Sequence, residues 1–320
     1  MKGRVVLFVL VALFAGVSWV LSLEASRLQD LTERVGVLDP RTFERLTLIT
    51  AGTGAAQEDP ERLGPIIVVG AGQHAVAIDA GRAAGEALRR AKLPLAQVDT
   101  VLLTSLLPEN VVGIPELLLA GWAASRSTPL RLVGPPGTKA LAAGIEQAYA
   151  GPIAAAAAAL GLSPDAAHIE ALEIGDGWRE EKNGLTLRAA ALPEGPFPAL
   201  AYRFESGGRA IVVSGVGFGR DALVALAKAA DVLVSEAMHT PTIERATTEQ
   251  APEAERIAKE AALHTHAAAS GEVAQRAGVR ELVLVRLRPP PLHDRQYTGL
   301  VRESFSGPVV VAEDAAEFTR

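Results

Sequence analysis

Residues 101–115 read Val-Leu-Leu-Thr-Ser-Leu-Leu-Pro-Glu-Asn-Val-Val-Gly-Ile-Pro. The apolar run that ends at Thr104 predicts a buried strand, and a helical pattern begins at Pro115. The segment between them is a loop that carries several polar side chains. These fifteen residues therefore contain both a strand-to-helix connection that indicates the fold and the polar side chains that could carry chemistry.

Strand and helix patterns alternate on both sides of this stretch. Strands are expected at Leu46–Thr50, Pro65–Val69, Ala75–Asp79, Thr100–Thr104, Leu130–Val133, Leu185–Ala190, Ala199–Glu205, Ala210–Ser214, Val232–Ser235, Leu282–Val285 and Val309–Val311. Helices are expected at Ala83–Ala91, Pro115–Ala124, Thr138–Ala150, Asp221–Ala229, Ala251–Ala262 and Gly271–Ala277. The alanine run Ala154–Ala159 also favours a helix. Such alternation predicts packed α and β layers.

Several short motifs accompany this pattern. They are Ala51-Gly52-Thr53-Gly54, Ile78-Asp79-Ala80-Gly81, Gly134-Pro135-Pro136-Gly137-Thr138, Val234-Ser235-Glu236-Ala237 and Val309 to Asp314. Through them, residues 46–316 resemble the metallo-β-lactamase superfamily, most closely its ribonuclease Z and arylsulfatase-like branch. The resemblance implies a four-layer αββα sandwich with an active cleft at one edge between two sheets.

In that family the segment that begins at the position of Thr104 reads Thr-His-X-His-X-Asp-His and helps to hold two metal ions, usually zinc, which activate water. Here the positions that match the family's ligands all carry other residues. They are Ser105, Leu107, Glu109, Asn110, Glu194, Val216 and Arg286.

These replacements argue against a dinuclear metal site. Leu107 and Val216 have no side-chain lone pair, and Arg286 brings a permanent cation to the place of two dications. Two like unit charges about 4 Å apart repel by roughly 4 kcal/mol at moderate dielectric. We therefore expect no zinc and no other cofactor.

Two interpretations of the remaining oxygens stay open. Glu109, Asn110 and Glu194 could hold one hard cation such as Ca²⁺ or Mg²⁺. Alternatively they pair with Arg286 and hydrogen-bond one another, as buried charges require. The second interpretation is favoured, because only two carboxylates are present.

A histidine and a carboxylate remain as candidate catalytic residues. The resemblance implies that His264 matches a non-ligand histidine that acts beside the scissile phosphate, and that Glu236 matches the carboxylate that contacts it. Such a pair can act as a general acid or base, although alone it supplies only a modest part of a hydrolytic barrier. A triad of Ser105, His264 and Glu236 or Glu109 can also be drawn, but Ser105 lacks the context of a nucleophile elbow.

The N-terminus predicts a membrane anchor. Val5–Leu23 is an apolar run whose helix would be about 28 Å long, close to the hydrocarbon thickness of a bilayer. Lys2 and Arg4 precede it, so the domain is expected on the periplasmic or extracellular side of the inner (cytoplasmic) membrane, after a single pass. A cleaved signal peptide and a secreted or periplasmic protein form the alternative, but the cleavage site near Ala25 fits poorly.

The expected organisation has three parts. Residues 1–23 form the anchor, residues 24–45 a helical stalk, and residues 46–320 the metallo-β-lactamase-like domain. Leu28, Leu31, Val35 and Leu38 fall on one stripe of the stalk, which could pack on the domain or on a partner.

The net charge and the absence of cysteine limit the classes of ligand and the kinds of chemistry expected of this chain. The formal net charge of −6 and a pI near 5.6 argue against nucleic acid as a ligand. The absence of cysteine excludes thiolate metal ligands, thiol catalysis and attachment as a lipoprotein.

Three functions follow. The leading hypothesis is a membrane-anchored, metal-free pseudoenzyme that binds or scaffolds an unknown protein or small molecule in its cleft. The second is a hydrolase of an ester or phosphoester, rebuilt around His264 and Glu236 with Glu109 and Glu194. The third is an interaction protein that works through its stalk.

Overall fold

The computed structural model describes residues 13–28, 38–55, 59, 61–215, 217–240 and 251–320. The chain divides into two compact units, Met1–Asp39 and Pro40–Arg320. In the first unit a helix with exposed side chains spans residues 13–28. Within the described ranges, no helix combines the length and the apolar character needed to cross a bilayer. The start of the expected anchor and the middle of the expected stalk, residues 1–12 and 29–37, lie outside the described residues.

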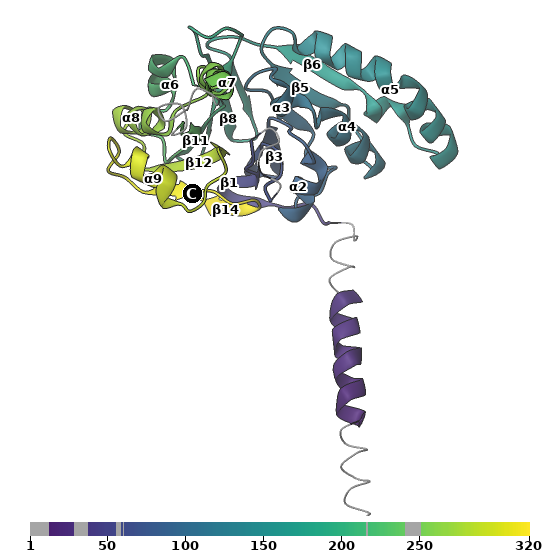
Figure 1. Ribbon diagram of the computed structural model, residues 1–320. Helices are drawn as coiled ribbons and strands as arrows, with labels where there is room; N and C mark the ends of the chain where they lie inside the picture. Colours follow the sequence, from purple (N-terminus) through teal and green to yellow (C-terminus); the bar gives the residue numbers. More distant parts are fainter. Residues whose placement is uncertain (1–12, 29–37, 56–58, 60, 216, 241–250) are drawn as a thin grey trace, which may run out of the picture. The chain divides into compact units, whose positions relative to one another are not determined.

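The second unit contains two mixed sheets (Figure 1). In spatial order, the first has β14 (Ala316–Thr319), β1 (Phe43–Gly52), β2 (Ile66–Gly72), β3 (His74–Ile78), β4 (Thr100–Leu102), β5 (Leu130–Gly134) and β6 (Ile169–Glu173). The second has β13 (Val309–Val311), β12 (Glu281–Arg288), β11 (Val232–Met238), β10 (Arg209–Ser214), β9 (Leu200–Ser206), β8 (Leu185–Ala191) and β7 (Arg179–Lys182). Strands β3 to β6 are parallel, as are β10 to β13, and the other pairs are antiparallel.

Helices cover the outer face of each sheet (Figure 1). The first sheet carries α2 (Ala84–Arg90), α3 (Pro108–Val111), α4 (Ile114–Ala123), α5 (Thr138–Leu160) and the 3₁₀ turn η1 (Pro164–Ala167) on its side of the unit. The second sheet carries α6 (Arg220–Leu226), α8 (Ala267–Ala277) and α9 (Arg295–Val301), and α7 (Ala251–Ala261) precedes α8.

Alternation of side chains along β1 explains the layers. Leu46 and Leu48 enter the core between the two sheets, whereas Ile49 and Ala51 enter the core under the helices of the first sheet. Successive side chains of a strand point to opposite faces, so one apolar strand serves two cores. A third core lies between the second sheet and its helices. Helix, sheet, sheet and helix thus form the expected αββα arrangement.

The differences from expectation have local causes. Strands β6, β7 and β14 and helices α3 and α9 were not predicted, because they are short and their sequences are polar or charged. Helix α5 continues from the expected helix Thr138–Ala150 through the alanine run, which was also expected to be helical, to Leu160, and Ile153 packs against Trp122. Strand β1 begins at Phe43, so the last residues of the expected stalk belong to the sheet.

Two hydrogen bonds join the sheets where β4 ends. The backbone N–H of Leu200 donates to the carbonyl of Thr104 at 2.8 Å, and the hydroxyl of Tyr202 donates to the carbonyl of Leu103 at 2.7 Å. Both acceptors belong to the segment that leads into the loop at 105–110. The loop therefore starts from a fixed point between the sheets.

Candidate functional site

A buried ion pair joins the two sheets at Arg286, one of the positions that match the family's metal ligands. The guanidinium of Arg286, on β12 of the second sheet, contacts the carboxylate of Asp79, which follows β3 of the first sheet. The side chains of Arg286 and Asp79 are only 2% and 0% exposed. The two charges must therefore neutralise each other, since an unpaired charge at this depth would be very costly.

Thr104 completes the environment of Asp79. Its backbone N–H donates to one carboxylate oxygen at 2.8 Å, and its hydroxyl donates to the other at 2.7 Å. Burial raises the pKa of Asp79, while the charge of Arg286 and the hydrogen bonds from Thr104 act in the opposite direction. Asp79 is thus held by both sheets at the start of the loop.

A β-bulge directs Arg286 into this position. Glu236 and Met238 on β11 pair with Val285 and Arg288 on β12, so β12 holds one residue more than β11 at this point. Arg286 has a φ of +51°, and its backbone N–H leaves the ladder to donate to the carbonyl of Thr53 at 2.7 Å. Bulges of this kind redirect a side chain and commonly occur at functional sites.

Gly215 makes room for the guanidinium. Its carbonyl accepts a hydrogen bond from Nη1 of Arg286 at 3.3 Å. A Cβ atom at this position would lie 2.6 Å from the same nitrogen. Glycine is therefore required here by the close approach of Arg286.

Beside the ion pair, the loop after β4 is held by neutral side chains. The amide of Asn110 donates to the hydroxyl of Ser105 at 2.9 Å and to that of Thr104 at 3.4 Å. Ser105 and Asn110 are fully buried, and Leu107 is half-buried. The loop at the family's metal-ligand positions is thus closed on itself by these bonds.

A second buried arginine links two helices to β12. Arg288 pairs with Glu109 of α3 at 2.7 Å and also with Glu260 of α7. Its side chain is 4% exposed. Glu109 is therefore engaged by Arg288 and does not pair with Arg286, so the expected partner of Arg286 was wrong. The bulge explains the difference, because it separates the directions of the two arginines.

His264 and Glu236 form the pair that the resemblance implied. Nδ1 of His264 lies 2.9 Å from a carboxylate oxygen of Glu236, and both side chains are buried. The other oxygen accepts from the backbone N–H of Thr265 at 2.8 Å and from its hydroxyl at 3.2 Å. Burial lowers the pKa of His264, but the charge and hydrogen bond of Glu236 outweigh it, so that the pKa is raised overall; the nearby Arg288 and Glu109 have smaller, opposed effects.

Other expected residues do not join these groups. Glu194 is exposed, with a φ of +73°, and no hydrogen bond or ion pair connects it to Glu109 or Asn110 in the described part of the chain. Val216 lies outside the described residues. Ser105 bonds to Asn110, and no hydrogen bond between Ser105 and His264 is found among the residues described, so the drawn triad is not formed there.

The side chains present do not fit a dinuclear metal centre. In the described ranges, no three His, Cys, Asp or Glu side chains gather as a metal ion would require. Asp79 and Glu109 both lie near the expected position, but each is already paired with an arginine. A dication would have to displace a buried guanidinium at each of them.

Sequence reasoning missed four members of this site. Asp79 was noted only as a strand end, and Thr104, Arg288 and Glu260 received no role. For Asp79 a signal existed, because a carboxylate directly after a buried strand must find a partner. Glu260 lies on an exposed-looking charged helix, where no pattern indicated a buried contact.

Comparison with known proteins identifies the family. No family model matches the chain. It is 30% identical over 277 residues to a ribonuclease Z of Mycobacterium bovis (strain BCG / Pasteur 1173P2). The matched residues cover 84% of this chain and 96% of that protein. The chain belongs to the ribonuclease Z branch of the metallo-β-lactamase superfamily. A ribonuclease Z of Mycobacterium marinum is 28% identical over 272 residues, 82% of this chain and 94% of that protein.

Solved structures show the same fold for this ribonuclease Z homologue. The metallo-β-lactamase fold protein YhfI from Bacillus subtilis has a TM-score of 0.65 at 17% identity, covering 86% of this chain and all of its own. The short form of human tRNase Z has a TM-score of 0.62 at 18% identity, covering 85% of this chain and 98% of its own. The expected fold is thus confirmed.

The central ion pair of this ribonuclease Z homologue can be tested by replacing one partner. We expect Arg286→Met to lower the free energy of unfolding by roughly 3–5 kcal/mol, because Asp79 would stay buried without its cation. Adding Asp79→Asn should recover part of this loss, since asparagine tolerates the positive φ of +60° and keeps an acceptor for Thr104. Urea denaturation measures both effects. Arg295→Met, on an exposed side chain, is the control, and equal small losses in both arginine variants would contradict the prediction.

The pair of His264 and Glu236 predicts a dependence of stability on pH. The raised pKa of His264 means that the folded state binds this proton more tightly than the unfolded state, whose value is about 6.5. The stabilisation is therefore fully present below about pH 6.5 and is lost as pH rises through the raised pKa. NMR titration of the imidazole should show this pKa. Glu236→Gln should lower it, His293→Gln on an exposed histidine should not, and a normal value in the unmodified chain would refute the prediction.

Proposed function

We propose that this chain is a metal-free and catalytically inactive member of the ribonuclease Z branch, which uses its cleft to bind or scaffold a protein or a small molecule. The buried pair of Arg286 and Asp79 carries this proposal. In metal-dependent relatives the corresponding place would hold cations that activate water. Here an internal cation neutralises the carboxylate and leaves no hydrolytic electrophile.

The surrounding contacts support the same proposal. Glu109 is tied to Arg288, and Asn110 to Ser105, so neither is presented as an open ligand. Binding a dication would require both ion pairs to open, which would leave the buried Arg286 without its carboxylate and would remove one of the two carboxylates that contact Arg288. The site is therefore stabilised in its metal-free form.

A second candidate function rests on His264 and Glu236. The 2.9 Å contact between them orients a buried imidazole, which is the arrangement of a general acid or base. With this pair a hydrolase of an ester or phosphoester could operate without metal. It is the weaker candidate, because a positioned nucleophile is missing from the described surroundings of His264.

Metal analysis combined with a hydrolysis assay tests both candidates. We expect the full-length chain, exposed to Zn²⁺, Mn²⁺ and Ca²⁺ and then dialysed, to retain no stoichiometric metal. We also expect no hydrolysis of bis(p-nitrophenyl) phosphate above background, because neither an activated water nor an electrophile is available.

The other outcomes separate the alternatives. About two tightly held equivalents of zinc or manganese would overturn the metal-free proposal. Metal-free hydrolysis that disappears in His264→Ala, and persists in the control His293→Ala, would establish the second candidate instead. The charge of −6 argues that an RNA substrate is the poorer choice for a first probe.

We also propose that residues 5–23 anchor the chain in the inner (cytoplasmic) membrane. Their apolar composition and the preceding Lys2 and Arg4 support this. We expect the full chain to stay with the membrane fraction after an alkaline carbonate wash, and a chain lacking residues 1–23 to be released. Recovery of the intact full chain in the supernatant would refute the anchor, and a shortened N-terminus would indicate cleavage.

A further inference from the structure

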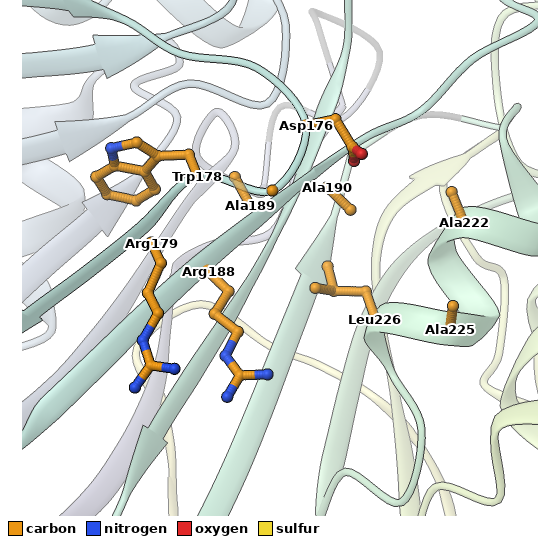
Figure 2. Close-up of a pocket in the computed structure, with 10 residues that line it drawn as sticks. Asp176, Trp178, Arg179, Arg188, Ala189, Ala190, Ala222, Ala225 and Leu226 are labelled. Atoms are coloured by element: carbon orange, nitrogen blue, oxygen red, sulfur yellow. The ribbon is translucent and has the colours of Figure 1, made fainter.

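A pocket of about 540 Å³ lies on the outer face of the second sheet, between the β7–β8 hairpin and α6 (Figure 2). Its volume is in the range of small-molecule sites. None of the residues around Arg286, Arg288 or His264 lines it. It is therefore separate from the cleft, and its use does not depend on whether the cleft is catalytic.

Three arginines form a row across the strands at this pocket. Arg179 on β7 is the direct partner of Arg188 on β8, and Arg188 is the direct partner of Arg203 on β9. Figure 2 shows Arg179 and Arg188 extending side by side in the same direction. Like charges directly opposite each other destabilise a sheet unless something compensates them.

Carboxylates compensate this row only in part. Arg203 is well held, by Glu205 at 2.9 Å and by the carbonyls of Leu226 and Lys228. Among the described residues, Arg179 and Arg188 each have one carboxylate at 3.4 Å, from Glu181 and Glu205.

These two contacts are weak for a second reason. The side chains of Arg179 and Arg188 are 55% and 45% exposed, and ion pairs at such positions contribute little. A guanidinium has five N–H donors, and each of these two shows one long contact of this kind. Most of their donors can therefore bind another anion.

The rest of the lining is mainly apolar, with the carboxylate of Asp176 as an exception. Ala222, Ala225 and Leu226 of α6 form one wall, and Ala190 of β8 continues it. Trp178 contributes to the rim, while its side chain packs against the core between the sheets. Asp176 is already engaged by the backbone N–H of Ala191 at 3.1 Å. A ligand that binds the two arginines would also contact this apolar wall. We therefore expect it to carry an uncharged organic part beside its anionic group.

We propose that this pocket binds a small organic phosphate monoester. Neighbouring strands lie about 4.8 Å apart, so two guanidinium groups in register can bracket one phosphoryl group from both sides. The apolar wall of α6 then covers the organic part of the ligand. Binding of the phosphoryl group reduces the repulsion between Arg179 and Arg188. This reduction stabilises the complex relative to the free protein.

Phenyl phosphate is a suitable probe, because it joins a phosphoryl group to a small apolar ring. We expect calorimetric titration of the full-length chain to show saturable binding that weakens as salt is raised. Arg179→Gln and Arg188→Gln should each weaken it by at least about tenfold, as expected for the loss of a charge-assisted contact. Arg295→Gln, an exposed arginine on α9, should leave binding unchanged.

Two further measurements keep the test decisive. Ala225→Trp fills the pocket from an exposed helix position without changing charge, and it should abolish binding while thermal stability is kept. Phenol and inorganic phosphate should each bind at least about tenfold more weakly than phenyl phosphate, because each lacks one half of the contacts. No saturation with phenyl phosphate, or equal affinity in the double arginine variant, would overturn the proposal.

Discussion

The positions of several neighbouring residues depend on a salt bridge between the two sheets. Arg286 and Asp79 are separated by 207 positions in the chain, and each comes from a different sheet. Their charges are removed from water, so each depends on the other. Thr104, Gly215 and Thr53 are fixed around them by hydrogen bonds or by close approach. The arrangement of the segments around Arg286 and Asp79 is therefore set by an internal pair of charges.

The second arginine extends this arrangement to the helices. Arg288 is two residues beyond Arg286, yet it contacts α3 and α7 rather than Asp79. The extra residue in β12 gives the two side chains different directions. One strand thus supplies both cations, of which Arg286 pairs with one carboxylate and Arg288 with two. His264 lies close enough for the charges of Arg288 and Glu109 to affect its pKa, so the pair of His264 and Glu236 is electrostatically coupled to the ion pair of Arg288.

Apolar strands could be predicted from the sequence, whereas most polar contacts could not, with the pair of His264 and Glu236 as the exception. Strands such as β1 and β12 are buried on both faces, which leaves a continuous apolar signal. Strand β7 reads Arg-Glu-Glu-Lys and forms only because it pairs with β8, so its own residues carry no such signal. The resemblance singled out Arg286, and the structure shows that its side chain is buried. Its partner depended on a bulge and on a long-range contact, and neither leaves a local pattern.

The mutual dependence of Arg286 and Asp79 also restricts how this sequence can evolve. Histidine at position 286 is the first step back toward the family's metal centre, but alone it would leave Asp79 buried without its full partner. A loss of several kcal/mol at one step is a large part of a domain's total stability. The other ligands would still be missing after that step, so no metal could restore the lost stability. Building a metal centre here would therefore need several simultaneous substitutions, because each single substitution would lose stability without gaining a metal ion.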